Sequence, residues 1–355
     1  MHIMEIKLDF SWKIAQQDID PVLFRLLESI QREGSLQKAT KQAGVSYRFA
    51  WGLLNKWQAL LEHPLVILER GRGATLSPAG ESLISANQKL IARFSPELDN
   101  ISTRFKREFE SVLSNQSSPR ASIFASHGIA INALRDLMHQ QSDLKLDLHF
   151  YGSLDSIRSL EQEQCDIAGF HIPEGSLAKQ IAPQYLEILN SAKHQLIYVV
   201  KRNQGLMVKH GNPKNITTIS SLTNSNIEFI NRQTDSGTRL LFDQLIQTDS
   251  INAEQITGYQ NEEFTHMAVA AMIASGAADV GFGIAPMADK FNLDFIPVAW
   301  EHYCLAVPLS FMIDPHVEQI IAILQSDGFK QTLAGLNGYE ADRSGETVEF
   351  NDIFE

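Results

Sequence analysis

The pattern of apolar and polar residues in the first third of the chain predicts three short helices. Asp20-Pro21 opens the first, with the aspartate as its cap and the proline in its first turn. The second is expected over Leu36–Gln42, and the third begins at Ser46, after the tight turn Ala43-Gly44-Val45. Two short helices that meet at a glycine turn form the helix-turn-helix arrangement.

Strand-like runs flank these helices. Residues 3–14 partly alternate apolar with polar positions and suggest an opening strand. Leu65–Leu68 and Ala74–Leu76 are expected to pair as a hairpin with the tip Glu69–Gly73. The sequence therefore predicts a winged helix-turn-helix domain, mainly helical, over residues 1–77.

A long helical pattern follows over residues 78–118. Its apolar residues recur at alternating steps of three and four, as in the seam of a coiled coil, so a linker helix that forms a homodimer is expected. A helix that packs only on its own domain is the alternative. Ser95-Pro96 predicts a kink or restart, and Asn115–Pro119 reads as a polar linker at a domain boundary. The seam consists of Ile84, Ile91, Phe94, Leu98, Ile101, Phe105 and Val112.

From Ala121 the pattern changes to strands that alternate with helices, which predicts a parallel sheet covered by helices. A similar unit recurs from Ile227 onward, and the segments Gln195–Val208 and Phe295–Val307 are placed to cross between the two units. We expect a two-lobed α/β domain over residues 119–338, with a ligand cleft between its lobes. The acidic segment 339–355 is expected to be a loosely ordered tail.

Composition limits the classes of protein. With 355 residues, of which 44% are hydrophobic, the chain can form two or three domains with sizeable cores. It has two cysteines, no signal-like start and no apolar run long enough to span a bilayer, so a cytoplasmic protein with no membrane partner is expected.

The net charge of −12 is unevenly divided. Residues 1–118 hold 15 basic and 13 acidic residues, and the remainder holds 15 and 29. This asymmetry favours a nucleic-acid binder confined to the first part.

The third helix and the hairpin tip carry the candidate contacts to double-stranded operator DNA. The start of a recognition helix commonly enters the major groove, and an arginine-rich wing contacts phosphates or the minor groove. For each residue alone, a solvated surface side chain is the alternative. The candidates are Ser46, Tyr47, Arg48, Trp51, Asn55, Lys56, Arg70 and Arg72.

The segment Asn231–Arg239 is the candidate anion site. A predicted strand, Ile227–Ile230, precedes it, and Ser236-Gly237-Thr238 falls at the start of a predicted helix, where free backbone N–H groups attract anions. Arg232 adds a cation with a planar fork of donors. An ordinary helix cap beside a surface arginine is the alternative.

Two resemblances to known families sharpen this picture. Gly44–Trp51, the hairpin and Leu76–Gly80 resemble the winged helix-turn-helix of ModE-type molybdate-responsive regulators and, more distantly, that of LysR-type regulators, over about residues 15–85. Nearly all of 121–310 resembles the PBP-like (periplasmic-binding-protein-like) domain found beside helix-turn-helix modules and molybdenum-cofactor proteins. Motifs such as Tyr151–Leu154 and Asp166–His171 carry the second resemblance. Together they imply a one-component transcriptional regulator that senses molybdate, tungstate or a related small molecule.

The resemblance also implies a ligand set. The spacing of Arg232 and Ser236-Gly237-Thr238 is similar to that of phosphate-binding proteins, in which these residues wrap a tetrahedral oxyanion. His171 stands where those proteins have an aspartate, and a histidine donor suits an oxyanion without a proton. The expected ligand-binding residues are Ser126, His127, Ser153, His171, Arg232, Ser236, Gly237, Thr238, Thr265 and His266.

Several alternatives stay open. The three histidines could donate to an oxyanion, bind a transition metal or be buried core residues, although no metal-ligand spacing supports a metal site. A pterin or other organic ligand could instead occupy the cleft, stacked on Tyr151, Phe170 or Phe264. An enzyme is not expected, because no Gly-x-Ser-x-Gly elbow or dinucleotide loop is present, and no covalent cofactor is expected.

Overall fold

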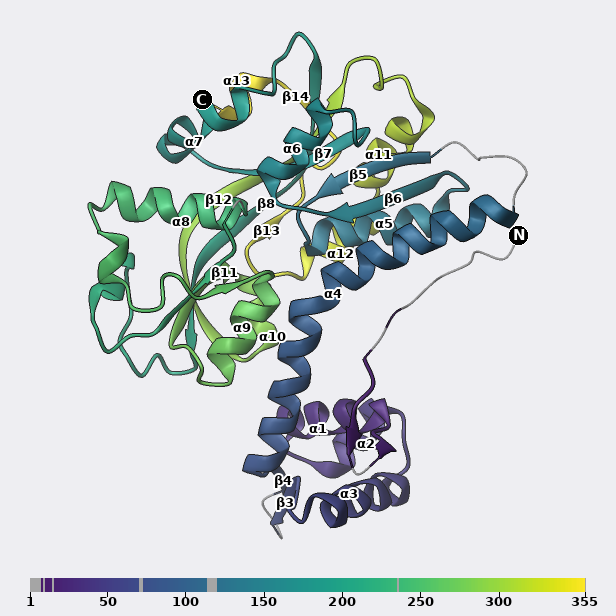
Figure 1. Cartoon of the computed structure of the whole chain (residues 1–355), viewed down its shortest axis with the longest axis vertical. Coiled ribbons are helices and arrows are strands. Elements are labelled where there is room, and N and C mark those ends of the chain that lie inside the picture. The colour runs from purple at the N-terminus through teal and green to yellow at the C-terminus, as the bar shows by residue number, and fades with distance from the viewer. Residues whose placement is uncertain are drawn as a thin grey trace. The chain divides into compact units, whose positions relative to one another are not determined.

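A computed structural model describes residues 8, 10–14, 16–69, 73–113, 120–234 and 236–354. The chain forms two compact units (Figure 1): Leu8–Ala92 is one, and the described residues from Arg93 onward belong to the other. The described part of the chain has no helix that is long and apolar enough to cross a membrane.

The first unit is a winged helix-turn-helix, which confirms the predicted fold class. The Asp20 carboxylate caps the first helix by accepting from the backbone N–H of Val22 (2.9 Å), and Gly44 forms the turn in a left-handed conformation (φ 69°). The fully buried Trp57 lies in its core. Its elements are β1 (Lys13–Ile14), β2 (Gln17–Asp18), α1 (Pro21–Glu33), α2 (Leu36–Ala43), α3 (Tyr47–Leu61), β3 (Val66–Glu69) and β4 (Gly73–Leu76).

Helix α4 (Pro78–Leu113) runs from the first unit into the second without a break. The prediction at Ser95-Pro96 was a kink or a restart; Pro96 lies inside the continuous helix, so the helix does not restart there. Ile84, the first residue of the predicted seam, is buried in the core of the first unit. The predicted linker, Asn115–Pro119, lies outside the described residues, as does most of the predicted opening strand.

The second unit is built on one mixed sheet, in the order β10-β9-β11-β8-β12-β7-β5-β6. The predicted parallel pairing holds within each half, where β5 pairs in parallel with β6 and β7, and β9 pairs in parallel with β10 and β11. Its strands are β5 (Arg120–Ala125), β6 (Lys145–Phe150), β7 (Ile167–Pro173), β8 (His194–Lys209), β9 (Phe229–Arg232), β10 (Glu262–Glu263), β11 (Val280–Ile284) and β12 (Leu293–Pro308).

Helices and short 3-10 turns flank this sheet. They are α5 (Ile129–Gln141), α6 (Ser153–Glu161), α7 (Ser176–Leu186), η1 (Ile219–Thr223), α8 (Gly237–Thr248), η2 (Ala253–Gln255), α9 (His266–Ala274), α10 (Ala285–Lys290), α11 (Pro315–Gln325) and α12 (Asp327–Ala334). We call the half built on β5–β7 lobe 1 and the half built on β9–β11 lobe 2.

Strands β8 and β12 are the segments predicted to cross between the lobes. They pair with each other, antiparallel, from Leu293 opposite Lys209 to Pro308 opposite His194. β12 also pairs with β7 of lobe 1, and β8 with β11 of lobe 2. The two lobes are therefore halves of one hydrogen-bonded sheet.

The predicted loose tail is wrong. Strands β13 (Tyr339–Glu340) and β14 (Thr347–Val348) both pair with β8, and helix α13 (Phe350–Phe354) follows them. Phe354 is buried against Phe170 and Tyr185 of lobe 1. The apolar residues among the acidic ones hold this segment against lobe 1. The prediction of a loose tail relied on the acidic charge of the segment and overlooked these apolar residues.

Candidate functional site

Arg232 is a buried cation at the end of strand β9. Its Nε donates to Gln233 Oε1 (3.0 Å) and its Nη2 donates to the carbonyl of Phe264 (3.0 Å), yet the side chain forms no ion pair with any described carboxylate. Burial, and to a lesser degree the nearby charge of Arg202, lower its pKa to about 9, so it stays charged at neutral pH. A desolvated cation held only by neutral groups suits an anionic ligand.

Helix α8 begins where it was predicted, but the hydroxyls of Ser236 and Thr238 at its start already accept hydrogen bonds from other groups of the protein. The Ser236 hydroxyl caps the helix by accepting from the N–H of Arg239 (3.1 Å), and the Thr238 hydroxyl accepts from Gln204 Nε2 (3.1 Å). A Cβ at Gly237 would stand 3.0 Å from Ser153 Oγ and 3.3 Å from the Cβ of His171. Gly237 therefore allows lobe 2 to approach lobe 1 closely.

Two of the three candidate histidines, His171 and His266, lie beside this start of α8. His171 stacks on Tyr303 (ring centroids 4.1 Å apart, 7° between planes), and His266 Nε2 lies 3.4 Å from the Thr238 hydroxyl. Burial first, then the two arginines 202 and 232, hold the pKa of His171 and of His266 well below the usual 6.5. Burial and Arg232 lower the pKa of His127 to about 4. All three rings are neutral at pH 7.

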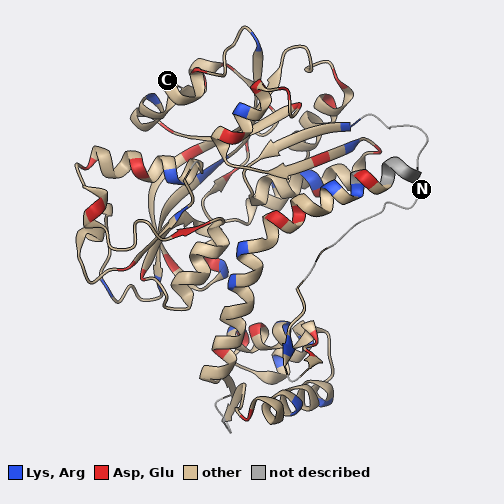
Figure 2. Ribbon diagram, viewed as in Figure 1, with Lys and Arg blue, Asp and Glu red and all other residues tan. Residues whose placement is uncertain are grey.

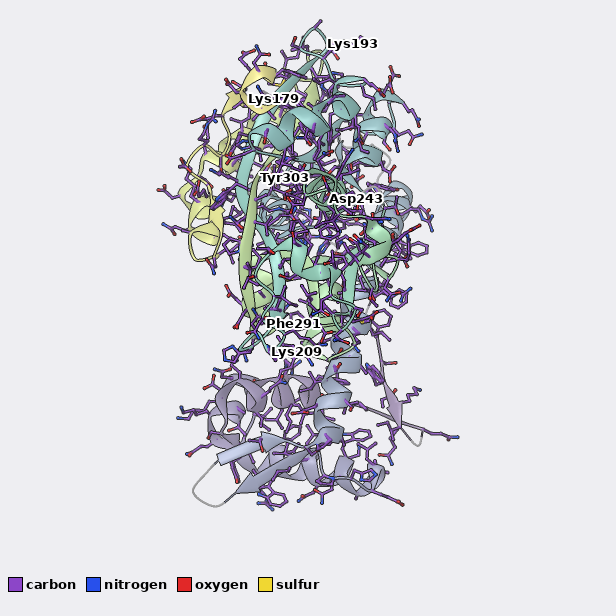
Figure 3. The ribbon with its side chains drawn as sticks, turned by 90° about the vertical axis from the view of Figure 1, so that its left-hand side faces the viewer. Lys179, Lys193, Lys209, Asp243, Phe291 and Tyr303 are labelled. Atoms are coloured by element: carbon purple, nitrogen blue, oxygen red, sulfur yellow. The ribbon has the colours of Figure 1, made fainter. Side chains whose placement is uncertain are left out.

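Several polar atoms beneath the site have no hydrogen-bond partner among the described residues. They are His171 Nε2, His266 Nδ1, Gln204 Oε1 and Tyr303 Oη, all buried. Tyr303 lies in the interior of the second unit (Figure 3). A buried polar atom without a partner costs free energy, so this cluster points to a ligand or water that would supply the partners.

Beneath this cluster lies a buried ion pair, and sequence reasoning did not predict it. Arg202 on β8 and Glu301 on β12 are registered opposite each other, and their buried side chains form a direct hydrogen-bonded pair. Glu301 neutralises Arg202, so Arg232 remains the cation available to a ligand. Lys201, Asn203 and Gln204 surround Arg202 in the sequence of β8, so no local pattern singles out this pair.

A pocket of about 460 Å³ opens at Arg232. Lobe 1 contributes Ser126, His127 and Tyr151, and lobe 2 contributes residues around Arg232 and Phe264. Helix α4 contributes Arg93, Pro96, Glu97 and Asn100, none of which was predicted. The other lining residues are Phe150, Gly152, Asp155, Gln233, Thr234, Ser236 and Glu262.

The ten predicted ligand residues divide into two groups. Ser126, His127, Arg232 and Ser236 line the pocket. Ser153, His171, Gly237, Thr238, Thr265 and His266 do not line it; they pack beside it or beneath it, and the Thr265 hydroxyl caps α9 by accepting from Ala268 N (2.9 Å). The alternative of buried, core-like residues therefore describes part of this second group. Phe170, one of the three stacking candidates, is fully buried in the core.

The predicted DNA-contacting residues of helix α3 share a solvent-exposed face. Ser46, Tyr47, Arg48, Trp51, Asn55 and Lys56 are all exposed, and the Ser46 hydroxyl caps the helix by accepting from Phe49 N (3.1 Å). Figure 2 shows basic residues on this helix. Arg70 and Arg72, at the predicted tip of the wing, lie outside the described residues.

Comparison with known protein families decides the class of the second unit. The model of the PBP superfamily domain matches residues 134–325, which is more than half of the chain. The chain belongs to this PBP-like family. The PBP-like domain therefore holds the pocket and the buried cluster of arginines and histidines.

Other proteins are similar over parts of the chain. Uncharacterized protein YvgK of Bacillus subtilis is 34% identical over 199 residues, 56% of this chain and 64% of YvgK. The DNA-binding transcriptional dual regulator ModE of Escherichia coli is 38% identical over 71 residues, 18% of this chain and 26% of ModE. The chain thus spans less than two thirds of these relatives. Among solved structures, OxyR of Corynebacterium glutamicum matches with a TM-score of 0.45 at 13% identity, over 89% of this chain and 94% of OxyR.

The lowered pKa values make the stability of the PBP-like domain dependent on pH. Below about pH 6.5 the unfolded chain binds protons at His127, His171 and His266 that the folded domain does not bind. Stability present above pH 6.5 should therefore be lost as the pH falls toward 4, with His127 contributing roughly 1–2 kcal/mol at pH 5.

Urea unfolding between pH 5 and 7.5 checks this dependence. His127→Gln should make it shallower, and the exposed His63→Gln should not. An equally steep loss of stability in His127→Gln would contradict the assignment of His127 as a partly buried, neutral group.

Proposed function

We propose that this chain is a ligand-responsive, DNA-binding transcriptional regulator whose effector is an anion held at Arg232 in the PBP-like domain. The observation that carries the proposal is Arg232 itself, a buried charge without a carboxylate partner in the described chain, on the wall of a pocket between two lobes. The winged helix-turn-helix with its exposed α3 face, and the partial similarity to ModE, support the DNA-binding half. The proposal assigns binding, and no reaction, to the pocket.

A tetrahedral oxyanion, molybdate or tungstate, is the first candidate effector. Arg232 would supply the charge, and Ser126 and neutral His127 would supply hydrogen bonds from the pocket wall. The ModE relatives support this candidate through the name of one of them, the molybdenum transport protein of Azotobacter vinelandii, 33% identical over 84 residues.

A larger organic anion is the second candidate, and the pocket favours it. Four oxyanion oxygens at about 30 Å³ each, the share of a water molecule, fill only a fraction of 460 Å³. Tyr151 from lobe 1 is 43% exposed and Phe264 from lobe 2 is 49% exposed, and both line the pocket. Half-exposed aromatic rings in a pocket suit a planar ligand such as a pterin that carries a carboxylate or phosphate.

Thermal unfolding of the full chain with added anions tests the proposal. A ligand that binds only the folded state stabilises it by about 2.7 kcal/mol at a hundredfold excess over its Kd. Molybdate, tungstate, sulfate, phosphate, phenyl phosphate and pterin-6-carboxylate form the panel. If none of these anions raises the unfolding temperature, the effector is not an anion of this panel's kind and the proposal is contradicted. A rise with molybdate or tungstate alone selects the oxyanion, and a rise with a planar anion selects the organic ligand.

We also propose that the regulator is a homodimer through α4. Phe94, Phe105 and Phe109 are exposed on this helix at spacings of 11 and 4 residues, which places them near one face. Lobe closure on a ligand would then change the DNA-binding units through the helix that joins the two units. Sedimentation equilibrium of the wild type and of Phe105→Glu tests this arrangement, because a charge in the seam should yield monomers.

The exposed face of α3 gives a prediction for DNA binding. Arg48→Ala should lower specific operator affinity by roughly 10- to 100-fold, since one good side-chain contact to a base is worth about 1–3 kcal/mol. An operator selected from random duplex DNA, followed by gel-shift titration, measures the loss. Gln58→Ala, also exposed on α3, is the control. Unchanged operator affinity in Arg48→Ala would remove this residue from the interface.

A further inference from the structure

The wall formed by helix α4 adds a second charged end to the pocket. Arg93 and Glu97 are exposed side chains one helical turn apart on the same face, and both line the pocket that Arg232 lines. Among the described residues neither side chain forms an ion pair, and the Arg93 guanidinium lies over the Phe94 ring, 5.8 Å from its centroid. A donor and an acceptor that are both available therefore face the pocket from α4.

This stretch of α4 is fixed to the edge of the sheet. The Asn100 amide donates to the carbonyl of Phe150 (3.1 Å) and its carbonyl accepts from the backbone N–H of Phe150 (2.7 Å). The Thr103 hydroxyl donates to the carbonyl of Leu148 (3.4 Å). Asn100 thus uses both its donor and its acceptor to hold α4 beside edge strand β6 (Figure 1), so the α4 wall is a formed part of the pocket.

Two aromatic rings line the same pocket, those of Tyr151 and Phe264. Phe124 stacks under Tyr151 (centroids 4.7 Å, 26° between planes) and holds that ring in place. The carbonyl of Phe264 accepts from Arg232, so the same residue positions the cation and presents a ring to the pocket.

We propose that the effector is a planar organic anion whose acidic group binds Arg232 and whose opposite, hydrogen-bonding end is held by Arg93 and Glu97, so that the linker helix itself binds the ligand. The ring lies against Tyr151 and Phe264. This inference rests on the proposed anion site and chooses the larger of its two candidate ligands. Ligand binding to α4 could then act directly on the DNA-binding unit, since α4 continues from the pocket into that unit as one helix.

Isothermal titration of the full chain tests the inference with tungstate as the compact probe and with phenyl phosphate, pyridoxal phosphate and pterin-6-carboxylate as planar probes. A planar anion should bind, Arg93→Ala and Glu97→Gln should each weaken it about tenfold, and Arg104→Ala, exposed on α4 outside the pocket lining, should not. Tyr151→Leu should weaken the planar anion and leave any binding of tungstate unchanged.

Hydrogen exchange gives a second readout. The same planar anion should slow amide exchange in 93–103 of wild-type α4, and the effect should be lost in Arg93→Ala although that variant folds normally.

Three results separate the possible failures. Tungstate binding without binding of any planar anion overturns the inference and leaves the proposed function standing. A planar anion whose Kd is unchanged by Arg93→Ala and by Glu97→Gln overturns the role of α4. No binding of any probe, with normal folding, overturns the anion site and the inference with it.

Discussion

Replacing Arg232 by methionine should abolish anion binding while leaving the ligand-free protein at least as stable as the wild type. The wild-type guanidinium is buried, and its lowered pKa of about 9 reflects the cost of that burial. Methionine keeps much of the side-chain volume and removes the desolvated charge. The free-energy cost of burying that charge therefore disappears, and so does the cation that binds the anion.

The expected loss of affinity is at least 10- to 100-fold, because a charged hydrogen-bond pair contributes about 1.5–3 kcal/mol and each 1.4 kcal/mol is tenfold in Kd. Titration with the anion found in the unfolding screen measures it, and urea unfolding of the ligand-free protein measures stability. Arg104→Met, at an exposed position, is the matched control. Wild-type affinity in Arg232→Met, or a loss of several kcal/mol without ligand, would show that Arg232 is a structural residue.

Glu301→Leu should strongly destabilise the PBP-like domain. It would leave Arg202 buried without its carboxylate on the strands that join the lobes, and breaking a buried pair from one side costs about 3–5 kcal/mol. The Tyr339 hydroxyl, which also bonds Arg202, cannot neutralise the charge.

A double variant separates the ion pair from general packing. Arg202→Met combined with Glu301→Leu removes both charges and should recover most of the stability, measured by urea unfolding. The exposed pair Arg343 and Glu346 is the matched control, and its disruption should cost no more than about 1 kcal/mol. A double variant as unstable as Glu301→Leu would mean that packing, rather than the unpaired charge, dominates.

Local patterns in the sequence predicted the elements well because their determinants are local. The Asp20 cap, the Gly44 turn and the alternation of strands and helices from Ala121 all appear where expected. The crossing segments were also placed correctly, one between the two α/β units of the sequence and one after the second unit. The position of Arg232 at the end of β9, just before α8, followed from the same reasoning.

The remainder of the site depends on long-range contacts that leave no local pattern. Nothing near Arg93 or Glu97 signals that their helix borders a pocket, because hydrogen bonds of Asn100 and Thr103 with strand β6, 50 and 45 residues away, bring α4 there. The pairing of Arg202 with Glu301 likewise spans 99 residues. Predicting the loose tail failed for the same reason, since β13 and β14 form strands only by adding to β8.

The split origin of the pocket bears on how such a regulator can diverge during evolution. The buried pair of Arg202 and Glu301 beneath Arg232 is tied into the sheet, so a change to either residue alone would cost stability. Arg93 and Glu97 are exposed on a helix that Asn100 already anchors, and surface substitutions of this kind usually alter stability by less than about 0.5 kcal/mol. Related regulators could therefore change which molecule they bind through substitutions at a few positions of α4, while keeping Arg232 as the anion-binding residue.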